Sequence, residues 1–401
     1  MRRLMPAGLG AMFAVVPIFP SFIALTGVAF PGLSLVPRPA ALGLLGVCIV
    51  LAVYALAMLA RYPSRGSIPL LVPLLAIFGA GVVAGIFGFD PRAGLLFTFI
   101  GGLGIVWHSA LMRFYGDRHA AAAIYWSYVI SGLLAALAAI AMVVTRFPAV
   151  QYAIHHGRAT GTFVLPGELA GYLIVFLPIA YALGRVGRPR SLRALAWSAF
   201  AIGLVALALT YSRAGWMGFA AAIAFLVAVR TRNGAGSAAL VVAAGVAAVL
   251  LLFNAHHDPS EDYTRLSIWQ AALQIVDRFP LFGVGPFNFS RLYELVRAPD
   301  ADATAFHAHS LYLTFFAEFG IVGVASVAWT MWRFTAELRR RLARAAPSDA
   351  LLALAVTAGL VGVAVQGLID TVTVVIFGLW MPVMGLALSA AQGADDGPTI
   401  E

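Results

Sequence analysis

The sequence predicts an all-α polytopic membrane protein with about twelve transmembrane helices and one large loop between the ninth and the tenth. Three observations predict it. The 401 residues are 62% hydrophobic and only 11% charged. Apolar runs recur at the length of about 20 residues that crosses a bilayer, and arginines lie in the short segments between the runs. No single core could bury so many apolar side chains, so a soluble globular protein is excluded.

The first predicted crossing runs from Gly8 to Phe30, after the positive start Arg2-Arg3. We interpret it as a retained helix, because it is longer than the apolar stretch of about 7–15 residues in a signal peptide. The further predicted crossings are 39–60, 68–89, 93–112, 120–144, 163–184, 194–211, 214–229, 236–254, 309–332, 350–369 and 371–390.

Arginine is the only basic residue apart from histidine, and its distribution predicts the orientation. With the N-terminus inside, seventeen arginines fall on the cytoplasmic side and nine outside. We therefore expect transmembrane helices 1–9 over 1–254, a periplasmic loop over 255–308, transmembrane helices 10–12 over 309–390 and a cytoplasmic tail over 391–401. Arginines that lie in short segments between apolar runs are typical of a protein in contact with membrane lipid rather than with nucleic acid. The single cysteine, Cys48, excludes an internal disulfide.

Residues 255–308 form the longest predicted loop and are expected to carry the extramembrane chemistry. Within them, Tyr263 to Phe279 has apolar residues at helical spacing, including Leu266, Trp269 and Leu273, before Pro280 ends the run. This pattern predicts an amphipathic helix able to lie on the membrane surface.

Three residues on the predicted outer side have side chains suited to chemistry on a diphosphate: Arg213, Arg265 and His309. An arginine fork binds phosphate oxygens through two hydrogen bonds and keeps its charge, so two forks suit a diphosphate. A histidine titrates near neutral pH and suits removal of a proton from a hydroxyl. Singly, such residues are more often head-group or helix-end residues than catalytic ones.

Together these residues lie in motifs that resemble the O-antigen ligase and polymerase superfamily. The motifs are HAHSLYLTFFAEFG, TYSRAGW, DYTRLSIWQAAL, PLFGVGPFNF and RATGTFVLPGELAGYL, which lie between about residues 158 and 320 in the order of the family. The first five crossings resemble the family only as generic apolar helices. Gly167-Glu168 departs from it, because related sequences tend to carry a Pro-Asn pair there.

The resemblance implies a GT-C-like glycosyltransferase of the bacterial inner membrane, with its active site on the periplasmic side. Such an O-antigen ligase moves a glycan from undecaprenyl diphosphate to a sugar hydroxyl of the lipid A core. Carried over residue by residue, Arg213 and Arg265 would bind the diphosphate and His309 would be the general base. The resemblance implies a metal-independent reaction without a cofactor, and one in-line displacement would invert the anomeric centre.

Three neighbouring residues are secondary candidates: Arg158, His307 and Tyr312. If the tenth crossing is helical from His309, Tyr312 shares the face of His309. A helical His307 would point about 200° away, so we rank His307 as a loop residue first and a helper second. Glu318 is the most clearly intramembrane charge, and we favour a structural role for it. Arg291 and Arg297 are further outer arginines that could widen the anionic pocket.

Metal sites are a weaker interpretation of the sequence. Asp300 and Asp302 imitate a metal-binding aspartate pair, but we favour a solvated acidic loop, since hard cations need more oxygen ligands. The pairs His155-His156 and His256-His257 are more typical of exposed loops than of metal sites.

Two other functions remain open. An O-antigen polymerase or a protein O-oligosaccharyltransferase would use the same donor with another acceptor. The ligase is modestly favoured, because members that glycosylate proteins often carry a further C-terminal soluble region. A transporter would require internal repeats and polar helices at the membrane midplane, which this sequence lacks.

Overall fold

The fold is all-α. The computed structural model describes residues 5–15, 38–62, 67–231, 233–250, 259–299, 301, 305–370 and 380–392, and these residues contain helices and no strand. The helices are α1 (Met5–Ala14), α3 (Arg38–Arg61), α4 (Leu71–Ile86), α5 (Pro91–Phe114), α6 (Arg118–Thr145), α7 (Ala149–Ile154), α8 (Pro166–Val186), α9 (Arg190–Leu209), α10 (Arg213–Arg230), α11 (Gly234–Ala248), α12 (Pro259–Arg278), α13 (Phe289–Val296), α14 (Leu311–Leu342), α15 (Pro347–Gln366) and α17 (Trp380–Gln392). The predicted fold class is confirmed.

Among the described residues, seven helices are long and apolar enough to cross a membrane: α5, α6, α8, α9, α10, α14 and α15. Shorter apolar helices, α1, α3, α4, α11 and α17, lie at the other predicted crossings. Much of the first predicted crossing, residues 16–30, and the start of the last, residues 371–379, lie outside the described residues.

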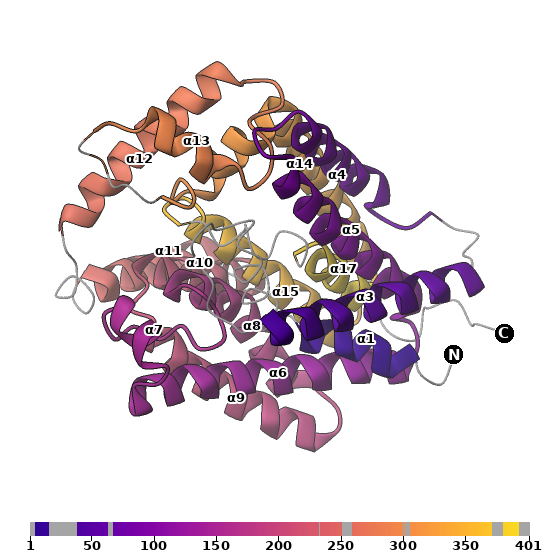
Figure 1. The fold of residues 1–401 in the computed structure, drawn as a ribbon. Coiled ribbons are helices and arrows are strands. Elements are labelled where there is room, and N and C mark those ends of the chain that lie inside the picture. Colours follow the sequence, from indigo (N-terminus) through magenta and orange to yellow (C-terminus); the bar gives the residue numbers. More distant parts are fainter. Residues whose placement is uncertain are drawn as a thin grey trace.

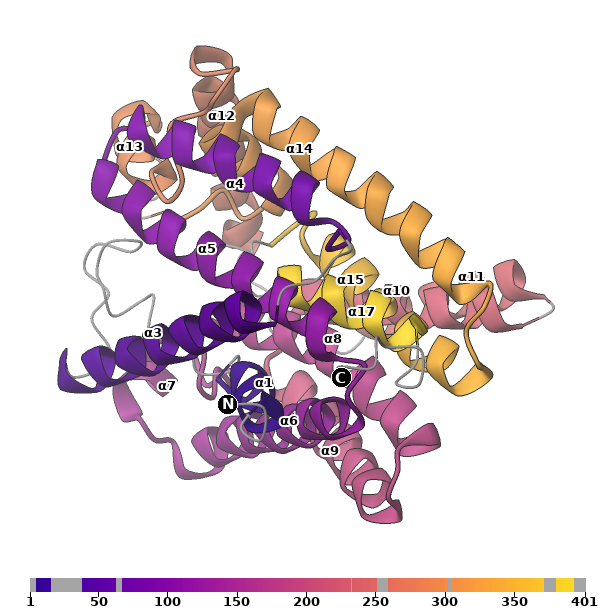
Figure 2. The same ribbon diagram turned by 90° about the vertical axis from the view of Figure 1, so that its right-hand side faces the viewer.

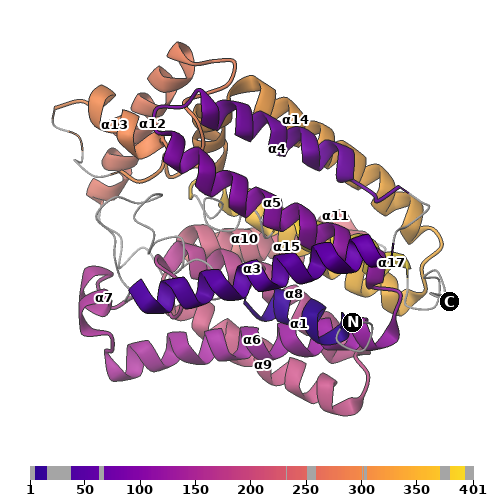
Figure 3. The ribbon, with the colours of Figure 1, turned by 45° about the vertical axis from the view of Figure 1, so that its right-hand side comes forward.

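α8 is the central helix, buried along nearly its whole length and packed against α9, α10 and α15. α10 and α15 approach closely at two glycines, where a Cβ on Gly218 would lie 2.6 Å from the carbonyl oxygen of Gly362. Small residues allow such close packing between apolar helices. α6 packs on α9 at one side of the bundle, and α4 packs on α14 at the opposite side (Figures 1 and 3).

Polar caps fix where several helices begin. The carboxylate of Asp90 accepts a hydrogen bond from Arg92 N at 2.9 Å and precedes Pro91, the first residue of α5. The carboxylate of Asp117 accepts from His119 N at 2.9 Å at the start of α6. These side chains accept hydrogen bonds from backbone N–H groups that have no partner within the helix. The two aspartates therefore fix the residues at which α5 and α6 begin.

α14 begins at Leu311, two residues after the start of the predicted crossing over 309–332, and continues to Leu342, ten residues beyond its predicted end. It is broken at Gly320, whose φ of 62° and ψ of −167° are accessible essentially only to glycine. The turn that follows α12 docks on this break: Ile321 N donates to Pro280 O at 2.8 Å, and Val284 N donates to Ala317 O at 2.9 Å. Figure 2 shows α14 as the long diagonal to the right of α12.

The predicted amphipathic helix is confirmed as α12, but the surface that covers it differs from the prediction. Ile268, Ala271, Ala272 and Ile275 are buried in a small apolar cluster that also includes residues of α13 and α14. Leu266, which was assigned to the apolar face, is 52% exposed. α12 therefore buries its apolar side against the protein rather than only against a membrane, because the unpredicted helix α13 covers it.

Two ends of the bundle differ in character. α7, α12 and α13 lie at one end, which Figure 3 shows at the left. The connections between α5 and α6, α8 and α9, and α14 and α15 lie at the other end, and together with the adjacent helix turns they carry ten of the 26 arginines. The assignment of the first end to the periplasm stays a prediction.

Candidate active site

Arg213 begins α10 at the tip of the hairpin formed by α9 and α10. The chain turns through Tyr211, which has a φ of 48°, and Ser212 then caps the helix by accepting a hydrogen bond from Gly215 N at 3.0 Å. Arg213 is partly buried in this turn. A cation at a capped helix N-terminus, beside backbone N–H groups, favours an anionic ligand over a neutral one.

Arg158 lies against the same turn. Its Nε donates a hydrogen bond to Thr210 O at 2.9 Å, and Ala159 N donates to Leu209 O at 2.9 Å. The segment before α8 is thus held on the hairpin tip, and Arg158 and Arg213 both flank Thr210–Ser212. The structure brings together these two arginines, of which the sequence had ranked Arg158 as secondary.

His307 and His309 form a pair just before α14. Their rings meet edge to face with centroids 4.5 Å apart, and His309 N donates a hydrogen bond to His307 Nδ1 at 3.2 Å. His307 is buried and His309 is partly exposed. His307 lies in the bend before α14, as its ranking as a loop residue predicted, and the helical angle of about 200° does not apply, because the helix starts two residues after His309 and His309 has a φ of 45°.

The same shift removes the predicted relation between His309 and Tyr312. Tyr312 lies in the first turn of α14, and its hydroxyl donates to Ala364 O of α15 at 2.8 Å. Leu311 N donates to Gly367 O at 2.8 Å, and Ser310 Oγ accepts from Leu313 N at 3.5 Å. These contacts attach the start of α14 to the end of α15 and hold the histidine pair in place.

Arg265 lies close enough to His307 to act on it electrostatically. Burial lowers the pKa of His307 well below its ordinary value, and the charges of His309 and Arg265 lower that pKa further. Arg265 lies in α12 and is partly buried. The candidate side chains therefore form two groups: Arg158 with Arg213 at the hairpin between α9 and α10, and Arg265 with the histidine pair before α14.

Glu318 lies in α14 next to the break, and its contacts are structural. Its carboxylate accepts a hydrogen bond from Phe289 N at 3.3 Å, at the start of α13. Gly285 N donates to Glu318 O at 3.0 Å. Glu318 thus holds the turn and α13 onto α14, which agrees with the structural role inferred from sequence.

The other outer arginines have structural contacts of their own. Arg291 forms an ion pair with Asp90 at 3.1 Å, and Arg297 donates to Ala301 O at 3.1 Å. Both contacts tie α13 and its flanking segments to neighbouring loops. We therefore assign neither arginine to the anionic site.

Two candidate metal sites lie outside the described residues: Asp300 with Asp302, and His256 with His257. His155 ends α7, and burial lowers its pKa, with a further lowering from Arg158. Within the described part of the chain, no group of three or more His, Cys, Asp and Glu side chains could hold a metal ion.

A buried polar cluster behind the histidine pair was not predicted from the sequence. Gln366 Nε2 donates to Gly167 O at 2.8 Å, and Leu311 N donates to Asp370 O at 3.0 Å. Glu168 and Gln366 are 4% and 0% exposed, and each has one oxygen without a hydrogen-bond partner among the described residues. The departure at Gly167-Glu168 was the available signal, but nothing in the sequence placed it beside α15.

A comparison with known families gives one match. Residues 198–328, about one third of the chain, match the sequence model of the family described as O-antigen ligase. The matched segment contains Arg213, Arg265 and His309, whereas Arg158 lies outside it. The resemblance inferred from the motifs is confirmed, and the match indicates an enzyme of the ligase or polymerase type. No curated protein matches the chain.

Proposed function

We propose that this protein is an O-antigen ligase that transfers a glycan from undecaprenyl diphosphate to a sugar hydroxyl of the lipid A core. One observation carries the proposal: the histidine pair before α14, whose ring centroids lie 4.5 Å apart, falls together with Arg213 and Arg265 inside the segment that matches the O-antigen ligase family. A base next to a fixed cation suits a reaction that joins a hydroxyl to a glycosyl diphosphate.

In the proposed reaction, the His309 imidazole removes the proton of the acceptor hydroxyl. The acceptor oxygen forms a bond to the anomeric carbon as the bond from that carbon to the diphosphate oxygen breaks. The electron pair leaves with the diphosphate, whose developing charge is stabilised by Arg213 and Arg265. A single displacement of this kind inverts the anomeric centre.

The two groups of side chains bind different parts of the donor diphosphate in the proposed reaction. Arg158 and Arg213 on the hairpin tip bind the donor diphosphate from one side, and Arg265 binds it beside the histidine pair. Guanidinium groups supply positive charge that other glycosyltransferases obtain from a divalent ion, so the proposed reaction needs no metal and no cofactor.

The acceptor separates the ligase from its alternatives, an O-antigen polymerase and a protein O-oligosaccharyltransferase. The purified protein is incubated with a lipid-diphosphate glycan and, in parallel, a lipid A core, a second lipid-linked glycan or an acceptor protein. We expect a product only with the lipid A core. Elongation of the lipid-linked glycan, or modification of the protein, would assign the alternative acceptor.

The proposed site faces the periplasm of a bacterial inner membrane. Cys48 is buried, so cysteines placed in a Cys48→Ala background report their own accessibility. A cysteine at Ser260 should react with an impermeant thiol reagent in spheroplasts, whereas one at Arg341 should not. The reverse labelling would contradict the proposed function.

A further inference from the structure

A cavity lies at the arginine-rich end of the bundle, far from the candidate active site. It has a volume of about 450 Å³ and lies between the residues that precede α4, the end of α5, the last turns of α14 and the end of α17. Four arginines contribute to its wall, together with a single acidic residue, Glu337; the arginines are Arg113, Arg333, Arg340 and Arg341. This excess of positive charge indicates an anionic ligand.

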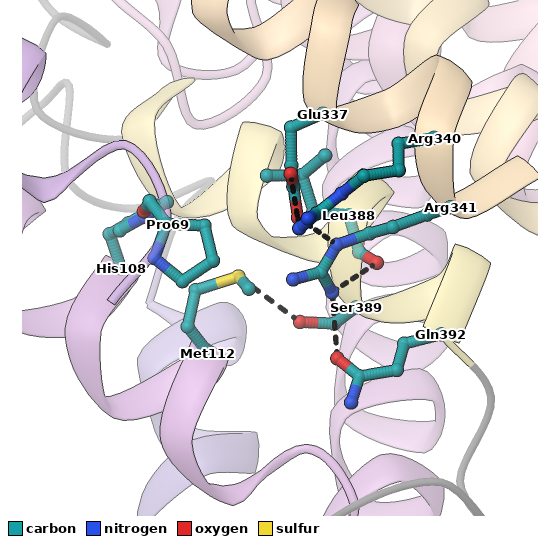
Figure 4. Close-up of polar contacts among 9 residues, drawn as sticks. All are labelled: Pro69, His108, Met112, Glu337, Arg340, Arg341, Leu388, Ser389 and Gln392. Carbon is teal, nitrogen blue, oxygen red and sulfur yellow. Dashed lines mark hydrogen bonds and ion pairs between the residues drawn. The ribbon is translucent and has the colours of Figure 1, made fainter. Parts of the chain in front are cut away.

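Two of these arginines are already engaged. Glu337 pairs with Arg340 at 2.7 Å and with Arg341 at 2.6 Å (Figure 4). Arg341 also donates to Leu388 O at 3.1 Å and to Gln392 Oε1 at 2.7 Å. Arg341 therefore connects α14 with α17 and forms a fixed part of the wall.

The other two arginines, Arg113 and Arg333, have no carboxylate partner among the described residues. Arg113 Nε donates a hydrogen bond to Tyr62 O at 3.3 Å. Guanidinium groups bind phosphate oxygens through paired hydrogen bonds. The wall thus offers two cations for one phosphate group.

The position of the cavity favours a lipid over a free ion. Arg341 lies 21 residues after the break at Gly320, which corresponds to roughly 30 Å of helix and therefore to the hydrocarbon core of a bilayer. Trp332, which precedes Arg333, is 66% exposed, and tryptophan is enriched at the membrane interface. Basic pockets between transmembrane helices at this depth bind anionic lipid head groups.

We propose that this cavity binds the phosphate head group of an anionic phospholipid, with Arg113 and Arg333 as the main ligands. The site lies at the end of the bundle opposite the histidine pair. It does not depend on the proposed transfer reaction.

The test uses the purified full chain in detergent, with phosphatidylglycerol, phosphatidylcholine or inorganic phosphate added, and measures bound lipid by native mass spectrometry. The variant Arg113→Gln/Arg333→Gln removes two charges from the cavity. Its control, Arg339→Gln/Arg344→Gln, removes two charges from exposed positions at the same end of α14 that do not line the cavity. Arg333→Gln alone changes only an exposed side chain, so it tests the same cavity even if the double variant fails to fold.

We expect phosphatidylglycerol to bind the wild type and the control alike, and to bind the cavity variant about 25-fold more weakly, at roughly fivefold for each arginine near a membrane surface. Arg333→Gln alone should weaken binding about fivefold. Equal binding of phosphatidylcholine, equal loss in the control, or competition by millimolar inorganic phosphate would overturn the assignment to an anionic lipid.

Discussion

The backbone N–H of His309 donates a hydrogen bond to Nδ1 of His307, at 3.2 Å. Because this bond uses the Nδ1 lone pair, a neutral His307 carries its proton on Nε2. His307 is buried, whereas His309 is partly exposed and has a φ of 45°. We infer that His307 positions the backbone of His309 and that His309 performs the chemistry.

This relationship predicts an asymmetric response at position 307. His307→Asn places an amide oxygen where it can accept the His309 N–H, whereas His307→Leu removes the acceptor and leaves an apolar side chain of similar size. We expect His307→Asn to retain most of the kcat and His307→Leu to lose about tenfold, as for one hydrogen bond of roughly 1.5 kcal/mol. Equal kcat values for the two variants would contradict a positioning role.

The lowered pKa of His307 predicts a dependence of stability on pH. The folded protein binds this proton more weakly than the unfolded chain, whose histidine has an ordinary pKa of about 6.5. The free energy of unfolding should therefore decrease as the pH falls below about 6.5. His307→Asn removes this contribution. When thermal unfolding is measured at a series of pH values, the midpoints of the two proteins should converge at acidic pH and keep a constant difference above pH 7. Parallel behaviour from pH 5 to 8 would refute the assignment of a neutral buried His307.

Arginine forks and a metal ion are two ways of stabilising a diphosphate, and they predict opposite results. We expect Arg213→Lys and Arg265→Lys to lower kcat/KM roughly 10- to 100-fold, the loss of a charge-assisted hydrogen bond of about 1.5–3 kcal/mol. Arg339→Lys is the matched control at the other end of the bundle. Activity should survive exhaustive chelation, and Asp300→Ala and Asp302→Ala should be mild. Activity that a chelator abolishes and magnesium restores, with lysine tolerated at both positions, would support the aspartates as metal ligands.

The break in α14 predicts a difference between two glycines. A Cβ on Gly320 would overlap the backbone of Leu281, at a φ and ψ that only glycine adopts readily. Gly320→Ala should therefore lower the free energy of unfolding by at least about 1–3 kcal/mol. A Cβ on Gly79, in α4, would meet no atom of another element within 4 Å, so Gly79→Ala should be neutral or slightly stabilising. Thermal unfolding in one detergent compares them, and equal midpoints would contradict the strained turn.

The helices were predictable from the sequence because apolar runs of bilayer length have no other stable structure in lipid. α8 to α10 follow the predicted crossings to within a few residues. The large loop was predicted less well. α12 was visible as a periodic pattern before Pro280, but α13 has only eight residues and gave too short a pattern.

The candidate site residues came from sequence motifs and their roles stay predictions, whereas their geometry comes only from the structure. The motifs identified Arg213, Arg265 and His309, and the structure places Arg265 with the histidines. The backbone of His309 could not be predicted, because its positive φ depends on the contacts of Ser310 and Leu311 with neighbouring segments. The cluster of Glu168 and Gln366 joins residues about 200 positions apart, and a single sequence contains no signal for such a contact.

The central claim is that His309 is the general base of glycan transfer. Its most direct test is the single-turnover rate of the purified protein with a lipid-diphosphate glycan and a lipid A core, measured beside the binding of the donor. We predict that His309→Ala lowers this rate by the roughly 10²–10⁴-fold typical of lost general-base catalysis and leaves donor binding nearly unchanged. His307→Ala should cost much less. A His309→Ala rate within a few-fold of the wild type, or equal losses from both histidines, would contradict the claim.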